Sequence, residues 1–250
     1  MMVAFFARVF RRAFARDFRA LRISRSGPAP EPASPRLIVY SNHPSWWDPV
    51  AFLLLADASF PGRPGYAPIE ARMARRYGFM ERIGTFGIDT ESRSGSAVFL
   101  AVARKVLQPP EGLLLVTAQG RFADSRERPV RLRPGLAHLA HWHPEATFVP
   151  LALDYVFWDE KKPELLVRFG QGIPARSIRD QPVADRSAAL GRALEDTMDA
   201  LAAEAIARNP DAFQTLLAGA VGVGGIYDFW RRSRALLRGE RFSPAHGDEL

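Results

Sequence analysis

Along most of this chain, short apolar runs typical of strands alternate with segments whose apolar residues recur at helical spacing. Short apolar runs bounded by turn residues predict buried strands over 36–41, 86–89, 112–117, 147–154 and 164–169. Apolar residues at helical spacing predict helices over 48–56, 70–77, 94–107, 134–142 and 186–208. Because strands and helices alternate, we expect an α/β fold in which one layered domain, over 36–210, holds a mixed sheet flanked by helices.

The first 26 residues carry a different pattern. Phe6, Phe10, Phe14 and Phe18 recur every four residues, and arginines occupy the other faces. This spacing predicts an amphipathic helix within 1–26, followed by a Pro/Ser/Gly linker over 27–35. Such a helix can lie in the interface of an anionic membrane, or it can pack on the domain through its Phe stripe.

An apolar run near the other end of the chain covers 213–230. Four glycines interrupt it, and it ends at Trp230 followed by two arginines. This order predicts an apolar and basic helical segment over 211–250, which enters the membrane interface or else joins the core. The sequence has no uninterrupted apolar run of transmembrane length.

Composition and charge narrow the classes of function. The 250 residues include no cysteine, which excludes thiolate zinc sites and cysteine nucleophiles. The formal net charge of +7 is concentrated at the two ends, with +6 in residues 1–26 and +4 in residues 231–241. The rest of the chain is therefore slightly acidic, and no nucleic-acid-binding motif accompanies the basic ends, so we expect no nucleic-acid partner.

A histidine and an aspartate five positions apart supply candidate chemistry. His43 and Asp48 follow the strand over 36–41. Five residues of a helix subtend about 500°, so the two side chains cannot share a helix face. They can meet if His43 lies on the turn before the helix, with Pro44 at the first helical position. Asp48 would then hold one imidazole nitrogen and leave the other free to deprotonate a hydroxyl.

Three further blocks follow this motif in order. They are GTFGID at 84–89, TAQGR at 117–121 and VPLA at 149–152. Together with the H-x4-D pattern, these blocks resemble those of the glycerolipid (lysophospholipid) acyltransferase family, which includes the 1-acylglycerol-3-phosphate acyltransferases. The resemblance covers roughly residues 34–175.

The resemblance implies an O-acyltransferase at the cytoplasmic face of a membrane, bound peripherally to its anionic surface. His43 would be the general base and Asp48 its partner, and a lipid hydroxyl would attack the thioester of acyl-CoA or acyl-carrier protein without a metal or other cofactor. Residues expected at the phosphates of a substrate are Arg93, Gln119, Gly120 and Arg121. Residues expected to wall the acyl chain or the site are Trp46, Trp47, Phe86 and Pro150, although core packing is an equal alternative for the two tryptophans.

Two positions depart from the family pattern. The second block has Thr90 where the family has Arg, and the third has Gln119 where the family has Glu. These changes favour a neutral hydroxylated lipid, such as a glycolipid, over lysophosphatidate, unless they are neutral drift. Two other classes of function stay open. One is a non-catalytic, peripheral membrane-binding protein on the same fold. The other is a metal-dependent hydrolase that uses the histidines at 138, 141 and 143.

Overall fold

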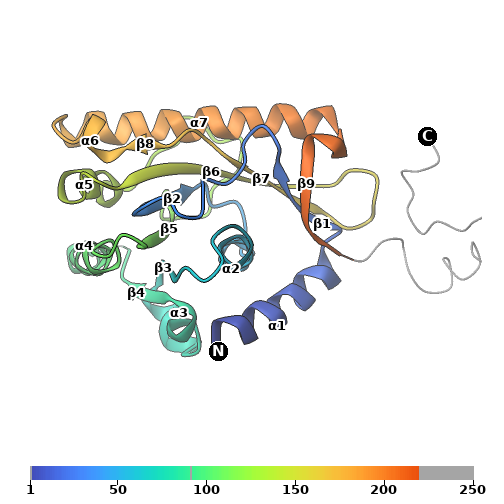
Figure 1. Ribbon diagram of the computed structural model, residues 1–250, viewed down its shortest axis with the longest axis horizontal. Helices are drawn as coiled ribbons and strands as arrows, with labels where there is room; N and C mark the ends of the chain where they lie inside the picture. The colour runs from blue at the N-terminus through green and yellow to red at the C-terminus, as the bar shows by residue number, and fades with distance from the viewer. Residues whose placement is uncertain (1, 91, 220–250) are drawn as a thin grey trace, which may run out of the picture.

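The computed structural model describes residues 2–90 and 92–219, which form layers around one mixed sheet (Figure 1). The strands are β1 (Ala20–Ser24), β2 (Leu37–Ser41), β3 (Gly65–Glu70), β4 (Thr85–Ile88), β5 (Leu113–Thr117), β6 (Thr147–Val156), β7 (Glu164–Phe169), β8 (Ile173–Pro174) and β9 (Phe213–Ala218). The helices are α1 (Met2–Asp17), α2 (Asp48–Ser59), α3 (Ala71–Arg76), α4 (Arg93–Val106), α5 (Gly135–Trp142), α6 (Ala175–Ile178) and α7 (Val183–Ala207), with 3₁₀ turns η1 (Met80–Ile83) and η2 (Pro210–Ala212). The α/β fold class expected from the sequence is confirmed.

The sheet has a parallel part and an antiparallel part. Its strand order is β4-β3-β5-β2-β6-β7-β1-β9, and the short β8 pairs with β6. The strands from β4 to β6 in this order are mutually parallel. Strand β7 is antiparallel to β6, β1 is parallel to β7, and β9 is antiparallel to β1. Strand β2 lies inside the parallel part, and all of its residues are buried.

Alternation along β2 sends its side chains into two separate hydrophobic cores. Leu37 and Val39 join a cluster with residues of α1 and α2, whereas Ile38 and Tyr40 join a cluster with residues of α4, α5 and α7. Figure 1 shows α7 along one face of the sheet and α1 with α2 along the other. Because helices cover both faces, the carboxyl edge of the parallel strands is where loops can build a site.

Helix α1 packs on the domain through part of its Phe stripe. The ring of Phe14 stacks on that of Phe18 with centroids 4.2 Å apart, and both side chains are buried. Nearer the start of the helix, Phe6 stacks on Phe79 at 4.8 Å. Phe5 lies on the outer face and is exposed. The stripe therefore attaches the helix to the domain, and contact with a membrane would fall to the outer face.

Within residues 2–90 and 92–219, no helix combines the length and the apolar character that crossing a membrane requires.

Two strands correct the expectations for the chain ends. The helix expected within 1–26 ends at Asp17, because residues 20–24 form β1 between β7 and β9. The segment expected to be helical from 211 onward first forms the turn η2 and then β9, which pairs with β1. The remainder of that segment, 220–250, lies outside the described residues. Strand β3, with a Gly and a Pro in six residues, also lacks the pattern that predicts a strand.

Candidate active site

The candidate site lies at the carboxyl ends of β2 and β5. Ser41 and Thr117 are register partners at the ends of these parallel strands. The loops that follow leave the sheet side by side, and the backbone N–H of Ala118 donates to the carbonyl oxygen of Ser41 at 2.9 Å. His43 and Gln119 each stand two residues beyond their strand, so the topology places them close together.

Hydrogen bonds fix the loop that carries His43. The amide side chain of buried Asn42 donates to the carbonyl oxygen of Leu153 and accepts from its N–H, both at 2.9 Å, which ties the loop to β6. The backbone N–H of His43 donates to Oε1 of Gln119 at 3.3 Å, and its carbonyl oxygen accepts from Ala123 at 3.0 Å. Gln119 is buried and holds the backbone of His43, a role that differs from the substrate contact expected of it.

His43 and Asp48 meet as the sequence predicts. Nδ1 of His43 lies 2.5 Å from Oδ2 of Asp48, whose side chain is fully buried. Oδ2 also accepts the backbone N–H of Ser45 at 3.1 Å, and Oδ1 accepts the hydroxyl of Tyr155 at 2.7 Å. The His43 side chain is 16% exposed, and its Nε2 makes no hydrogen bond within the described residues. This nitrogen is therefore the one left to exchange a proton with a ligand.

The local backbone differs from the prediction around Pro44. Helix α2 begins at Asp48, Trp47 is its N-cap, and Pro49 occupies its first turn. The predicted role of Pro44 at the first helical position is therefore wrong. The first helical position is Asp48, whose carboxylate is favoured there by the helix dipole, and Pro49 follows it at the second position, where its fixed φ suits the first turn. His43 reaches Asp48 across the loop, not from a helix cap.

Tyr155 is a member of the site that sequence reasoning misses. Burial and the adjacent Asp48 carboxylate raise the pKa of its hydroxyl, so this group stays protonated and donates its hydrogen bond to the carboxylate. Tyr155 is 107 residues from Asp48 in sequence, and the predicted strand ended one residue before it. Strand β6 continues to Val156, and the two strand-forming residues Tyr155 and Val156 that follow Asp154 were the available signal.

Three aromatic residues near His43 in sequence or space, Trp46, Trp47 and Phe122, differ in their contacts and exposure. The ring of Phe122 lies 4.2 Å from that of His43 at a tilt of 30°, and Phe122 is largely exposed. Trp46, three residues beyond His43, is also largely exposed. The ring of Trp47 packs edge-on against Phe18 at 5.0 Å and joins the core beside α1 and α2. Of the two tryptophans, Trp47 is a packing residue, and a place in the wall of the site stays a prediction for Trp46.

Two of the expected phosphate ligands, Gly120 and Arg121, make contacts within the protein. Gly120 has a φ of +64°, and its N–H donates to the carbonyl oxygen of Thr117 at 3.1 Å, so it forms a turn. The exposed guanidinium of Arg121 forms an ion pair with Glu127. Arg93 begins α4, and its side chain lies outside the described residues. A phosphate would therefore have to compete with Glu127 for Arg121.

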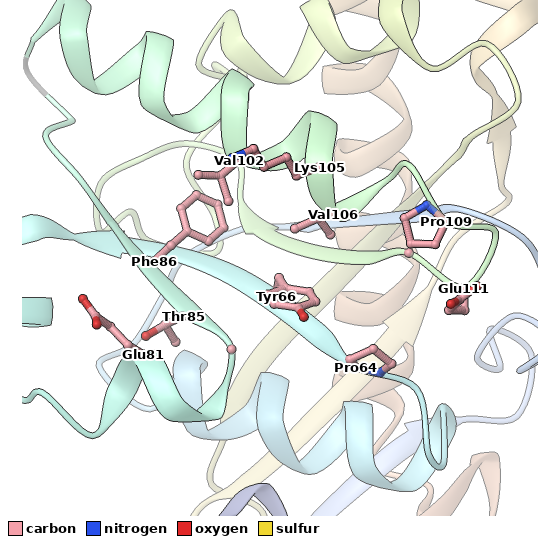
Figure 2. Close-up of a pocket in the computed structure, with 12 residues that line it drawn as sticks. Pro64, Tyr66, Glu81, Thr85, Phe86, Val102, Lys105, Val106, Pro109 and Glu111 are labelled. Carbon is pink, nitrogen blue, oxygen red and sulfur yellow. The ribbon is translucent and has the colours of Figure 1, made fainter.

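Phe86 lies in a pocket at the amino ends of the parallel strands, opposite to the ends that carry His43. The pocket has a volume of about 490 Å³, and its lining includes residues at the amino ends of β3, β4 and β5 and in the second half of α4. Figure 2 shows the ring of Phe86 pointing toward Val102 of α4, and Tyr66 of β3 lying below Val106 in this view. Because β5 is parallel to β2, this edge is remote from the carboxyl edge that carries His43. Phe86 is thus not a wall of the candidate site.

Pro150 also lies away from His43. It is buried in β6, where its register partner is Tyr40, a member of the core beneath α7. A Cβ on Gly170 would come within 2.7 Å of Pro150 and 2.2 Å of Thr197, which shows how closely β6, β7 and α7 approach here. Pro150 therefore packs between the sheet and α7, and it does not wall the site.

The histidines at 138, 141 and 143 do not assemble a metal site. Among the described residues, no group of three or more His, Asp or Glu side chains lies close enough to hold a metal ion. His143 is buried at the end of α5, and its Nε2 has no hydrogen-bond partner there. Burial lowers the pKa of this imidazole. These histidines give no support to a metal-dependent hydrolase.

Comparisons with known proteins add no relative to this picture. No protein-family model matches the chain, and no curated protein aligns with it.

Proposed function

We propose that this protein is a peripheral membrane O-acyltransferase. It would act at the cytoplasmic face, moving a fatty acyl group from acyl-CoA or acyl-carrier protein to a hydroxyl of a lipid acceptor. One observation carries the proposal: Nδ1 of His43 is bound to the buried Asp48 carboxylate, and Nε2 has no described partner. A histidine held in this way is equipped to take a proton from a hydroxyl.

The proposed reaction is a direct transfer. Nε2 of His43 takes the acceptor's hydroxyl proton as the oxygen attacks the thioester carbonyl carbon. The new C–O bond forms, the C–S bond breaks, and the leaving thiolate takes the proton from the imidazolium as a free thiol. The Asp48 carboxylate stabilises the imidazolium between these two proton transfers. The chain has no cysteine, so a cysteine acyl-enzyme is excluded.

The acceptor is proposed to be a neutral hydroxylated lipid. Gln119 is uncharged and is already bonded to the His43 backbone, and Arg121 is paired with Glu127. A phosphate headgroup needs charge-assisted donors to offset its desolvation, and these contacts do not offer one free of competition. We expect a higher kcat/KM for a glycolipid or another neutral acceptor than for lysophosphatidate at a fixed acyl donor. A tenfold preference for lysophosphatidate would refute this choice.

Labelled acyl-CoA incubated with the protein and host lipid extract tests the transferase proposal. We expect a labelled lipid and released thiol in equal amounts. The His43→Ala variant should lose roughly 10²- to 10⁴-fold in rate. The matched control is His141→Ala, which removes an exposed histidine from α5. If the wild-type protein binds vesicles but transfers no acyl group from acyl-CoA or acyl-carrier protein, the non-catalytic membrane-binding alternative replaces the proposal.

The membrane part of the proposal rests on the outer face of α1. Arg8 and Arg12 are exposed there. Replacing both by Gln should weaken sedimentation with anionic vesicles about 30-fold, since each basic residue near such a surface contributes about 1 kcal/mol. The control replaces Arg176 and Arg192, which are exposed on α6 and α7. Equal binding by both double variants would contradict a membrane contact through α1.

A further inference from the structure

The Asp48 carboxylate is bonded at both of its oxygens inside the protein. Oδ2 faces the Nδ1 of His43 and the backbone N–H of Ser45, and Oδ1 accepts the hydroxyl of Tyr155 at 2.7 Å. A carboxylate held by one oxygen alone can rotate about its Cβ–Cγ bond. The bond from Tyr155 opposes that rotation, and it places part of the negative charge on the oxygen that faces away from the imidazole.

Apolar contacts hold the Tyr155 ring in place. Its centroid lies 5.8 Å from that of Phe18, which in turn stacks on Phe14 and packs edge-on against Trp47. The ring is therefore held by its own strand and by Phe18 in the turn after α1, and Phe18 is held in turn by Phe14 and Trp47. The position of the hydroxyl follows from this packing and does not depend on a bound ligand.

We infer that Tyr155 is a positioning residue for the His43–Asp48 pair, and this inference rests on the proposed acyl transfer. Its hydroxyl holds the carboxylate in the rotamer in which Oδ2 faces Nδ1. The hydroxyl also disperses the negative charge, so the carboxylate does not draw the shared proton away from the imidazole. No substrate contact is assigned to Tyr155. Its effect on the reaction passes through Asp48.

Two substitutions separate this role from ordinary packing. Tyr155→Phe removes only the hydroxyl and leaves the ring against Phe18. Tyr40→Phe is the matched control, because Tyr40 is a buried tyrosine on β2 whose hydroxyl donates to the carbonyl oxygen of Leu190 at 3.1 Å. Each variant loses one buried hydrogen bond of a tyrosine, and only one of those bonds reaches Asp48.

Two measurements read the result in the full-length protein. For Tyr155→Phe we expect kcat to fall about 10-fold with KM within twofold of wild type, since a bond to a charged group is lost and substrate contacts are not. Tyr40→Phe should keep both constants within twofold. In proton NMR, the His43 Nδ1–H resonance should move downfield in Tyr155→Phe, because a carboxylate with fewer donors is a stronger acceptor. This resonance should stay in place in Tyr40→Phe.

A second variant keeps the test decisive if Tyr155→Phe does not fold. Incorporation of 3-fluorotyrosine at position 155 keeps the ring and strengthens the hydroxyl as a donor, so the Nδ1–H resonance should move upfield. An unmoved resonance in either folded variant, or equal shifts in the Tyr155 and Tyr40 variants, overturns the inference. A wild-type protein without transfer activity defeats the proposed function instead, and the NMR shift then decides the positioning role on its own.

Discussion

Replacing Asp48 by Asn separates the charge of this residue from its shape. The amide oxygen of Asn can take the place of Oδ2 and accept from Nδ1 of His43 and from the N–H of Ser45. The amide nitrogen then faces Tyr155, whose hydroxyl oxygen can accept from it. The variant should therefore fold, and it should keep the imidazole in place. What it loses is the negative charge beside an imidazolium.

The magnitude of this loss follows from the geometry. The Nδ1–Oδ2 distance of 2.5 Å places the two charge centres about 4 Å apart. At an effective dielectric constant of about 20, two unit charges at this separation attract by about 4 kcal/mol. If the proton is half transferred in the transition state, about 2 kcal/mol of that attraction is lost there. The expected fall in kcat is therefore between about 30-fold and about 900-fold.

The assay follows release of free thiol from acyl-CoA in the presence of the acceptor, with kcat and KM determined for each variant. Asp57→Asn is the matched control, because Asp57 lies on the same helix, is partly exposed and pairs with Arg11. The control should retain wild-type kcat. If Asp48→Asn keeps a kcat within threefold of wild type and an unchanged circular dichroism spectrum, the carboxylate does not stabilise an imidazolium and the general-base reasoning fails.

Three further predictions concern stability. Phe14 is fully buried against Phe18, so Phe14→Ala should lower the free energy of unfolding by about 3–5 kcal/mol in urea titrations, and a loss below 1 kcal/mol would contradict the packing of α1. Burial lowers the pKa of the His143 imidazole, so the unfolded chain binds a proton more readily than the folded protein and stability falls as the pH drops below 6.5. His143→Asn should therefore show a smaller fall in Tm between pH 7 and pH 5 than the wild type, and an equal fall would show that His143 is not its cause. Burial raises the pKa of the Asp154 carboxyl, so ionisation of this group opposes folding as the pH rises above 3.8. Asp154→Asn should therefore raise Tm at pH 7 but not at pH 3, and a lower Tm at pH 7 would refute this reasoning.

Much of the fold could be predicted because its central strands are apolar and its long helices are amphipathic. The runs that became β2, β5, β6 and β7 are buried strands in sequence and in structure. Strands β1 and β9 could not be predicted locally. Leu21 continues the apolar spacing of α1, and Arg22 stands inside a strand because it pairs with Glu164, a residue 142 positions away. Only tertiary pairing makes this segment extended.

In the candidate site, too, local contacts could be predicted from the sequence and long-range contacts could not. The contact between His43 and Asp48 is local, and it was predicted from the spacing together with a turn before the helix, although Pro44 does not begin that helix. The distant partners were not visible in any local pattern, since Asn42 bonds to Leu153 and Asp48 bonds to Tyr155 from more than a hundred residues away. The substrate role predicted for Gln119 was displaced by its bond to the His43 backbone, which depends on the register of β2 and β5.

The place of β1 between β7 and β9 also sets an order of events during synthesis. The bond from Arg22 to Glu164 spans 142 residues, so at 5–20 residues per second the ribosome needs about 7 to 28 s to make the first partner of this strand. Strand β9 follows later still. By the end of this interval α2, beside which α1 packs, and the strands β2 to β6 have already been made, whereas β1 has only just gained a partner strand. Helix α1 can therefore pack beside α2, through the contact of Phe14 with Trp47, before the strand that follows it joins the sheet. Although β1 is the first strand to be made, it is thus among the last to be paired on both of its edges.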